Sequence, residues 1–135
     1  MPSTVANNLQ RMIAPQQADA LARNAEIMAG LGGAGETLEE NRERAEAARG
    51  IWNQGGPVIA MNEARTIPGP FRDVPVQFYR TDEEASLPVF VYLHGGGFRI
   101  GGPRSNDLQM RQLVEDWRGA VISADYLHVP EHVFP

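Results

Sequence analysis

A short apolar segment that runs directly into three glycines limits the fold of this chain more than any other feature. Residues 89–93 are all apolar or aromatic, and His94, Gly95, Gly96 and Gly97 follow without a break. Uninterrupted apolar strands are typical of sheet positions that are covered on both faces. Each glycine costs backbone entropy on folding, so three in a row need a structural or chemical reason. The pattern predicts a buried strand that ends in a loop whose backbone has a structural or chemical role.

A helix and a second buried strand follow the glycine loop. Residues 105–107 can cap a helix, and its apolar residues follow the spacing of one helical face: Met110, Leu113, Val114 and Trp117. Residues 121–126 form the second apolar segment. A strand, a helix and a strand in this order predict two parallel strands joined by a right-handed crossover. Ligands bind at the carboxyl ends of such strands, where the glycine loop lies.

Residues 3–50 are predicted to be helical, with a cap at Ser3 or Thr4 and an interruption or a new start at Pro15. Thr37 and Glu40 match a capping box for a polar helix that should end near Gly50. Because this second helix has little apolar surface, we interpret residues 1–50 as a helical lid and residues 51–135 as the body.

The body begins with a strand pattern of its own. Val74, Val76 and Phe78 alternate with Pro75, Gln77 and Tyr79, which predicts a strand with one buried face. Proline cannot donate a ladder hydrogen bond, so Pro75 predicts an edge strand or a bulge.

Composition excludes several classes of function. The net charge is −5 and no basic stripe is present, which argues against a nucleic-acid partner. The sequence contains no cysteine, so thiolate catalysis and disulfides are excluded. No apolar run approaches the length of a membrane span, and no signal peptide is visible at the start. We therefore expect a cytoplasmic protein.

These segments resemble the hormone-sensitive lipase group of α/β-hydrolases, the bacterial family IV esterases. The matching segments are Val89 to Phe98, Val121 to Tyr126, Pro130-Glu131-His132, Phe134-Pro135 and Thr66 to Pro70. The resemblance implies the amino-terminal part of an α/β-hydrolase fold, a mostly parallel sheet with flanking helices, preceded by helical lid segments. Residues 51–135 would be the amino-terminal half of the catalytic domain. The chain departs from the family pattern at Leu127, His128 and Val129, where the family usually has Arg, Leu and Ala.

The resemblance also assigns roles in the glycine loop. It implies that the amides of Gly96 and Gly97 are oxyanion-hole donors and that His94 and Gly95 shape the turn. Such donors stabilise the negative charge that develops during acyl transfer. The implied activity is carboxylic ester hydrolysis, with a small ester as substrate and no cofactor.

The nucleophile of such an enzyme is missing from this sequence. None of its serines lies in a Gly-x-Ser-x-Gly elbow, the setting of the family's nucleophile. A central strand without its neighbour would become an exposed apolar edge. We therefore expect a complementary carboxy-terminal chain that carries the Ser-Asp-His triad. Whether the completed enzyme also forms a homo-oligomer is left open. The alternative is a non-catalytic module whose glycine loop binds a carboxylate or an ester.

The sequence gives weaker support to two other kinds of site, a dinucleotide-binding loop and a metal site. The glycine loop does not match the dinucleotide fingerprint, because Ile100 stands where the last glycine should be. His128 and His132 have one-turn spacing, but Pro130 between them disfavours a helix. We therefore predict no metal and leave the role of both histidines open. Glu131 is interpreted as a buried or capping carboxylate that organises its loop.

Overall fold

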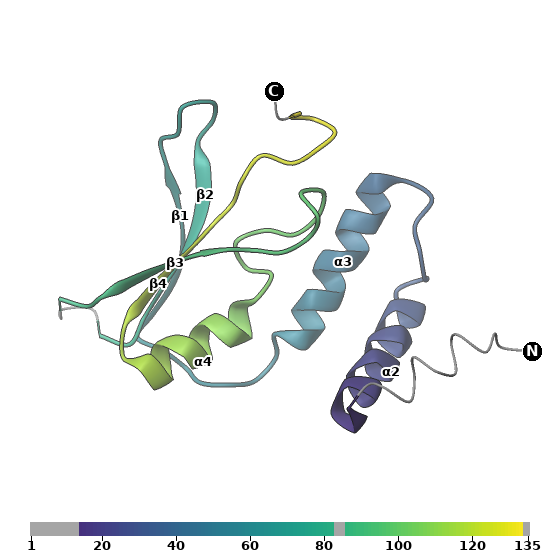
Figure 1. Cartoon of the computed structure of the whole chain (residues 1–135), viewed down its shortest axis with the longest axis horizontal. Helices are drawn as coiled ribbons and strands as arrows, with labels where there is room; N and C mark the ends of the chain where they lie inside the picture. Colours follow the sequence, from purple (N-terminus) through teal and green to yellow (C-terminus); the bar gives the residue numbers. More distant parts are fainter. Residues whose placement is uncertain (1–13, 83–85, 134–135) are drawn as a thin grey trace, which may run out of the picture.

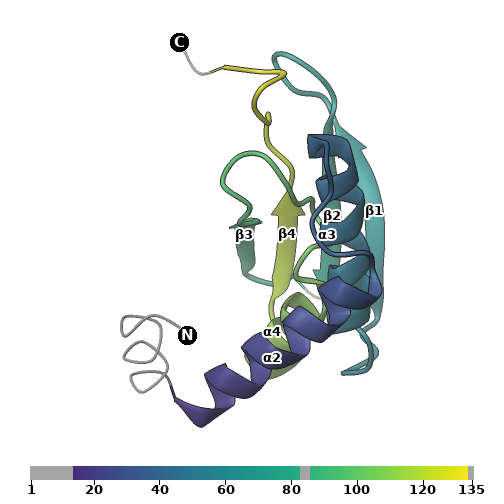
Figure 2. The same ribbon diagram turned by 90° about the vertical axis from the view of Figure 1, so that its right-hand side faces the viewer.

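The computed structural model describes residues 14–82 and 86–133, so the predicted caps at Ser3 and Thr4 fall outside it. Its elements, in chain order, are α2 (Pro15–Gly30), α3 (Leu38–Trp52), β1 (Met61–Ile67), β2 (Val74–Arg80), β3 (Val89–Leu93), α4 (Asp107–Trp117) and β4 (Ala120–Ala124). The three helices lie on one side of the sheet (Figures 1 and 2). None of the helices in this part of the chain is long and apolar enough to cross a membrane.

The four strands form one sheet in the order β1-β2-β4-β3. The predicted parallel pair is confirmed, since β3 pairs with β4 in parallel. The mostly parallel sheet belongs to the fold that the resemblance implies; in this portion the sheet is mixed, because β1–β2 and β2–β4 are antiparallel. The reason lies in the connections: only β3 and β4 are joined through a helix, whereas β1 and β2 follow each other through a short hairpin loop.

The core lies between the sheet and α4. Tyr79 from β2 and Val121 from β4 pack against Met110 and Val114 of the helix, and all four side chains are buried. The helical spacing of apolar residues therefore identified the buried face of α4 correctly. On β2 the predicted face is only partly right, because Tyr79, assigned there to the polar side, joins this core.

Strand β3 is the edge of the sheet and is largely uncovered. Val89, Val91 and Leu93 alternate along the face opposite α4, with 56%, 63% and 61% of their surface exposed. This differs from a central strand covered on both faces, and it matches the exposed apolar edge expected when the neighbouring strand is absent.

The prediction that Pro75 marks an edge or a bulge is wrong, because β2 is an interior strand between β1 and β4. The pairing of β2 with β4 reaches only as far as Val76, the residue that follows Pro75. The carbonyl of Pro75 accepts a hydrogen bond from the Asp125 amide, just beyond the end of β4. In an antiparallel strand the nitrogen and the carbonyl of one residue face the same neighbour, so the ring nitrogen of Pro75 also points beyond the end of β4. The proline therefore removes no bond from either ladder.

The two amino-terminal helices, α2 and α3, form with the predicted signals. Pro15 is the first residue of α2. In α3, the Glu40 amide donates to Thr37 Oγ1 over 3.1 Å and the Thr37 amide donates to Glu40 Oε2 over 3.2 Å, which confirms the capping box. The helix passes Gly50 and ends at Trp52 instead, whose indole donates to Asn24 on α2. This contact between the helices favours the additional residues.

Candidate active site at the carboxyl ends of β3 and β4

The glycine loop leaves β3 with a backbone that only glycine adopts readily. Gly96 has a φ of +145° and Gly97 a φ of +61°, both in the region that L side chains rarely adopt. A Cβ on Gly96 would overlap the carbonyl oxygen of Ile100, because the loop folds back there and the Ile100 amide donates to the Gly96 carbonyl. The run of glycines thus permits a close turn at the end of a parallel strand.

The amides of Gly96 and Gly97 are available to a ligand. Among residues 14–82 and 86–133, neither amide donates a hydrogen bond to a protein acceptor. Next to the loop, Gly96, Arg99 and Ile100 line a cavity of about 430 Å³ together with the first turn of α3. Two free N–H groups at such a place can donate to a developing anionic oxygen.

Behind the loop, His94 is completely buried and holds the loop to the segment after β4. Its Nδ1 lies 3.0 Å from the Gly95 carbonyl oxygen, and its Nε2 lies 3.0 Å from Asp125 Oδ1. The Tyr126 ring stacks on the imidazole at 4.3 Å, and the Tyr126 hydroxyl donates to the His94 carbonyl over 2.6 Å. Arg72 donates to Asp125 Oδ2 over 2.9 Å.

The electrostatics of this contact keep Asp125 ionised. Burial disfavours the carboxylate, but the hydrogen bonds from His94 and Arg72 outweigh burial and hold the pKa of Asp125 below its ordinary value. The base of the glycine loop is therefore held by a charged hydrogen-bond network that connects β3, β4 and the β1–β2 hairpin.

Arg42 connects α3 to the other side of the glycine loop. Its Nε donates to the Arg99 carbonyl over 2.8 Å, and its two terminal nitrogens donate to the two carboxylate oxygens of Glu131 over 2.6 and 2.9 Å. The Val129 amide in turn donates to the Phe98 carbonyl over 2.8 Å. One guanidinium therefore joins α3, the glycine loop and the segment that follows β4.

Comparisons with known proteins agree on one family. A family model described as the α/β hydrolase fold matches residues 90–135. An ester hydrolase from the metagenome of Lake Arreo is 30% identical over 92% of this chain and 41% of its own, with a TM-score of 0.75. A hyperthermophilic esterase of the archaeon Pyrobaculum calidifontis is 32% identical over 91% of this chain and 39% of its own, also with a TM-score of 0.75. The chain belongs to the α/β-hydrolases.

EstE1, a thermostable carboxylesterase from a metagenomic library, is also similar. It is 30% identical over 73% of this chain and 34% of its own, with a TM-score of 0.66. The chain spans about two fifths of the length of the first two solved hydrolases, 41% and 39%. It is thus the amino-terminal part of the α/β-hydrolase fold, as the resemblance implied.

The structure brings together some of the predicted residues and separates others. His94 and the glycine loop lie at the carboxyl ends of β3 and β4, where the strand pattern placed them. His128 lies against the same network, with its ring 5.4 Å from that of His94. His132 is exposed and lies outside the network. Glu131 is half exposed instead of buried, and it organises its loop through Arg42.

Two arginines of the site had no sequence signal. The family pattern places an arginine where this chain has Leu127, and the structure shows Arg72 of the β1–β2 hairpin on Asp125 instead. Arg42 reaches Glu131 across 89 residues of sequence. Neither pairing follows from periodicity or from a local motif, because both depend on how distant segments pack.

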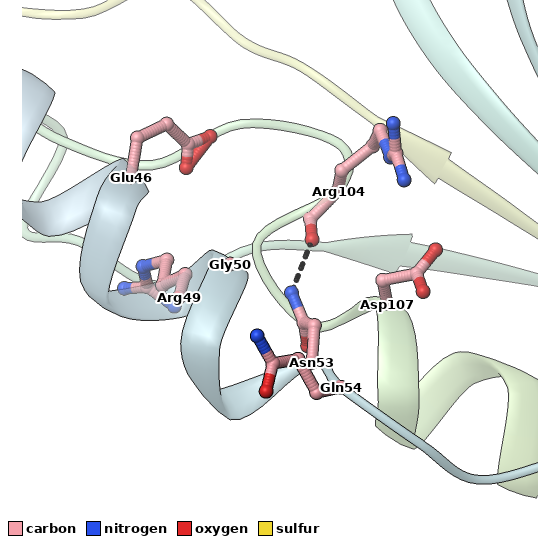
Figure 3. Close-up of a pocket in the computed structure, with 7 residues that line it drawn as sticks. All are labelled: Glu46, Arg49, Gly50, Asn53, Gln54, Arg104 and Asp107. Atoms are coloured by element: carbon pink, nitrogen blue, oxygen red, sulfur yellow. Dashed lines mark hydrogen bonds between the residues drawn. The ribbon is translucent and has the colours of Figure 1, made fainter.

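A second cavity, of about 350 Å³, lies between the end of α3 and the start of α4 (Figure 3). Charged and amide side chains surround it, including Glu46, Arg49 and Asp107. The Asn53 side-chain amide donates to the Arg104 carbonyl there over 3.0 Å. We interpret this cavity as part of the polar contact between α3 and α4, because its hydrogen bonds connect those elements.

The contact between Arg42 and Glu131 predicts a specific acid sensitivity. The hydrogen bonds from Arg42 lower the pKa of Glu131 from 4.5 to about 2. A carboxylate with a lowered pKa stabilises the fold above its ordinary pKa, and that contribution is lost as the pH falls from 4.5 towards 2. In wild type, the midpoint of thermal unfolding should therefore fall more steeply over this range than in Glu131→Gln. Thermal unfolding followed by circular dichroism measures this.

Glu115→Gln is the control for this prediction, because Glu115 is an exposed carboxylate on α4 outside the contact. It should follow the wild-type pH profile. Equal slopes for wild type and Glu131→Gln would show that the ion pair does not stabilise the fold.

Proposed function

We propose that this chain supplies the oxyanion hole of a serine carboxylesterase of the hormone-sensitive lipase type. In this proposal the amides of Gly96 and Gly97 donate to the carbonyl oxygen of a small ester, while His94 and Gly95 shape the loop. The observation that carries it is the pair of free amides on a strained loop at the carboxyl end of β3. The similarity to three solved ester hydrolases at 30% identity or more supports it.

The chemistry of acyl transfer explains why such a loop would be rigid. When a nucleophile attacks the ester, the carbonyl oxygen gains a negative charge, and donors already in place stabilise it without reorganisation. The contacts of His94 and Arg42 fix the two sides of the loop before substrate arrives. Donors that bind the transition state more strongly than the substrate raise kcat.

The triad belongs to a complementary polypeptide in this proposal. The position of β3 at the edge of the sheet supports a missing neighbouring strand, and its exposed apolar side chains support a missing cover over that face. Among the described serines, Ser86 is exposed, Ser105 accepts a bond from the Gly102 amide and Ser123 is buried in β4. None of these three serines has a hydrogen bond to a histidine in the described part of the chain.

We further propose that α2 and α3 act as a lid. The cavity beside Gly96 is closed on one side by the first turn of α3, with Thr37, Leu38 and Asn41 in its wall. Residues at this end of α3 would therefore contact the substrate, whereas the rest of the helix holds the loop through Arg42.

Complementation tests the proposal. The purified chain alone should not hydrolyse a short p-nitrophenyl ester, because it lacks the nucleophile. Mixing it with a polypeptide that supplies the elbow serine, the acid and the histidine should restore hydrolysis, measured as p-nitrophenol release. The complementary polypeptide alone is the control and should be inactive without the oxyanion loop. Turnover by the chain alone, or a folded complex without turnover, would contradict the proposal; the second result would favour the non-catalytic binding module.

A further inference from the structure

Three potential metal ligands converge behind the glycine loop. One ligand atom from each of His94, Asp125 and His128 lies within 4.8 Å of the other two. His94 Nε2 is 3.0 Å from Asp125 Oδ1, and His128 Nε2 is 3.4 Å from the same oxygen. His94 is fully buried, and the side chains of the other two are 16% and 17% exposed. The three groups thus share one mostly buried point.

The hydrogen bonds of His94 leave a conflict at that point. Both of its ring nitrogens face acceptors, the Gly95 carbonyl and the Asp125 carboxylate. A neutral imidazole has one N–H, so it can donate to only one of them. If Nε2 donates to Asp125, as in the metal-free protein, then the lone pair of Nδ1 faces the Gly95 carbonyl oxygen. If Nδ1 donates to Gly95, then the lone pair of Nε2 faces the carboxylate oxygen. A cation between Nε2 and the carboxylate resolves the conflict, because Nδ1 can then donate to Gly95.

His128 adds a second unsatisfied atom at the same place. Its Nε2 is buried and has no hydrogen-bond partner among the described residues, although it lies 3.4 Å from Asp125 Oδ1. Buried polar atoms without a partner are rare and need an explanation. A proton on His94 would satisfy His94 and Asp125 but would leave His128 unexplained. One ion shared by all three residues explains both observations.

We infer that His94 Nε2, Asp125 Oδ1 and His128 Nε2 form a binding site for one divalent transition-metal ion, with Zn²⁺ as its probe. Two imidazoles and one carboxylate suit such ions. Metal–ligand bonds of about 2.1 Å place ligand atoms about 3.0 Å apart at right angles and about 3.4 Å apart in a tetrahedron. The distances of 3.0 and 3.4 Å to Asp125 Oδ1 match these values.

The surrounding contacts suit the three ligands. A metal-bound histidine usually donates its other N–H to a carbonyl or a carboxylate, which fixes its tautomer. His94 has that partner in the Gly95 carbonyl. Arg72 donates to Asp125 Oδ2, which leaves Oδ1 for the ion. Bound metal would therefore join the base of the glycine loop to the segment after β4.

Calorimetric titration of Zn²⁺ into the full, untagged, EDTA-treated chain tests the site. Wild type should bind one ion, and His128→Leu should weaken binding by about 100-fold or more. His132→Leu is the matched control, since His132 is exposed outside the cluster, and it should bind like wild type. The absence of binding in wild type, or equal binding in His128→Leu, would overturn the site.

Two further measurements distinguish loss of the metal site from misfolding of the variant. His128→Gln keeps a polar side chain of similar length and should lose Zn²⁺ binding while its circular dichroism spectrum stays that of wild type. Zn²⁺ at 100 times its Kd should raise the unfolding midpoint of wild type by roughly 5–10 °C and leave that of His128→Gln unchanged. Equal shifts in both proteins would place the ion elsewhere.

Discussion

Gly96→Ala is expected to lower kcat of the proposed esterase, completed by its triad-bearing polypeptide, by about 10²–10³, the effect of losing one oxyanion donor. The added Cβ would overlap the Ile100 carbonyl oxygen, and the φ of +145° is one that alanine rarely adopts. The loop must therefore change shape, which turns the Gly96 and Gly97 amides away from the substrate. KM should change much less, because the donors act mainly in the transition state. Steady-state kinetics on a p-nitrophenyl ester measures both constants.

Gly102→Ala is the matched control, a glycine near the end of the same loop. Its Cβ would only touch Glu46 Oε1 at 3.6 Å, an ordinary contact, so kcat should stay within a few-fold of wild type. Gly97→Ala separates two causes of a lower kcat, backbone strain and contact with the substrate. Its φ of +61° strains alanine by about 1–2 kcal/mol, but no protein atom lies within 4 Å of the new Cβ. A larger loss there would come from contact with the substrate. A normal kcat in folded Gly96→Ala would reduce the loop to a plain turn.

The parts of this fold that could be predicted from sequence are those with a local cause. The capping box at Thr37, the apolar face of α4 and the glycine loop after β3 depend on residues within a few positions of each other. The parallel pairing of β3 and β4 followed from the helix between them.

Features that depend on the distant packing of segments were predicted less well. The interior place of β2 was missed because a proline signals an edge only when its nitrogen faces a paired neighbour, and Pro75 lies beyond the end of β4. The partners of Asp125 show the same limit. The motif identified this carboxylate, but its partner Arg72 comes from the β1–β2 hairpin, and the chain has Leu127 where the family usually has Arg. Sequence spacing cannot show which distant arginine pairs with Asp125.

Asp125→Ala is expected to lower the free energy of unfolding by about 3 kcal/mol. Asp125 is 16% exposed and accepts hydrogen bonds from both Arg72 and His94. Removing one member of a buried charged contact leaves its partners without compensation, which typically costs about 3–5 kcal/mol. The lower end applies because Arg72 is 34% exposed and can turn towards water, whereas the fully buried His94 cannot. Urea unfolding of the full chain in EDTA, followed by circular dichroism, measures the change without any contribution from metal.

Asp73→Ala is the control for this prediction, because Asp73 is an exposed carboxylate next to Arg72 in the sequence. Its effect should stay within about 0.5 kcal/mol, as for most surface substitutions. The comparison separates the specific network from a general loss of negative charge, since both variants remove one carboxylate. It also bears on the site, because His94 holds the start of the glycine loop through Asp125. If Asp125→Ala were no more destabilising than Asp73→Ala, the network would not hold the loop. The rigidity that oxyanion stabilisation requires would then have to come from Arg42 and Tyr126.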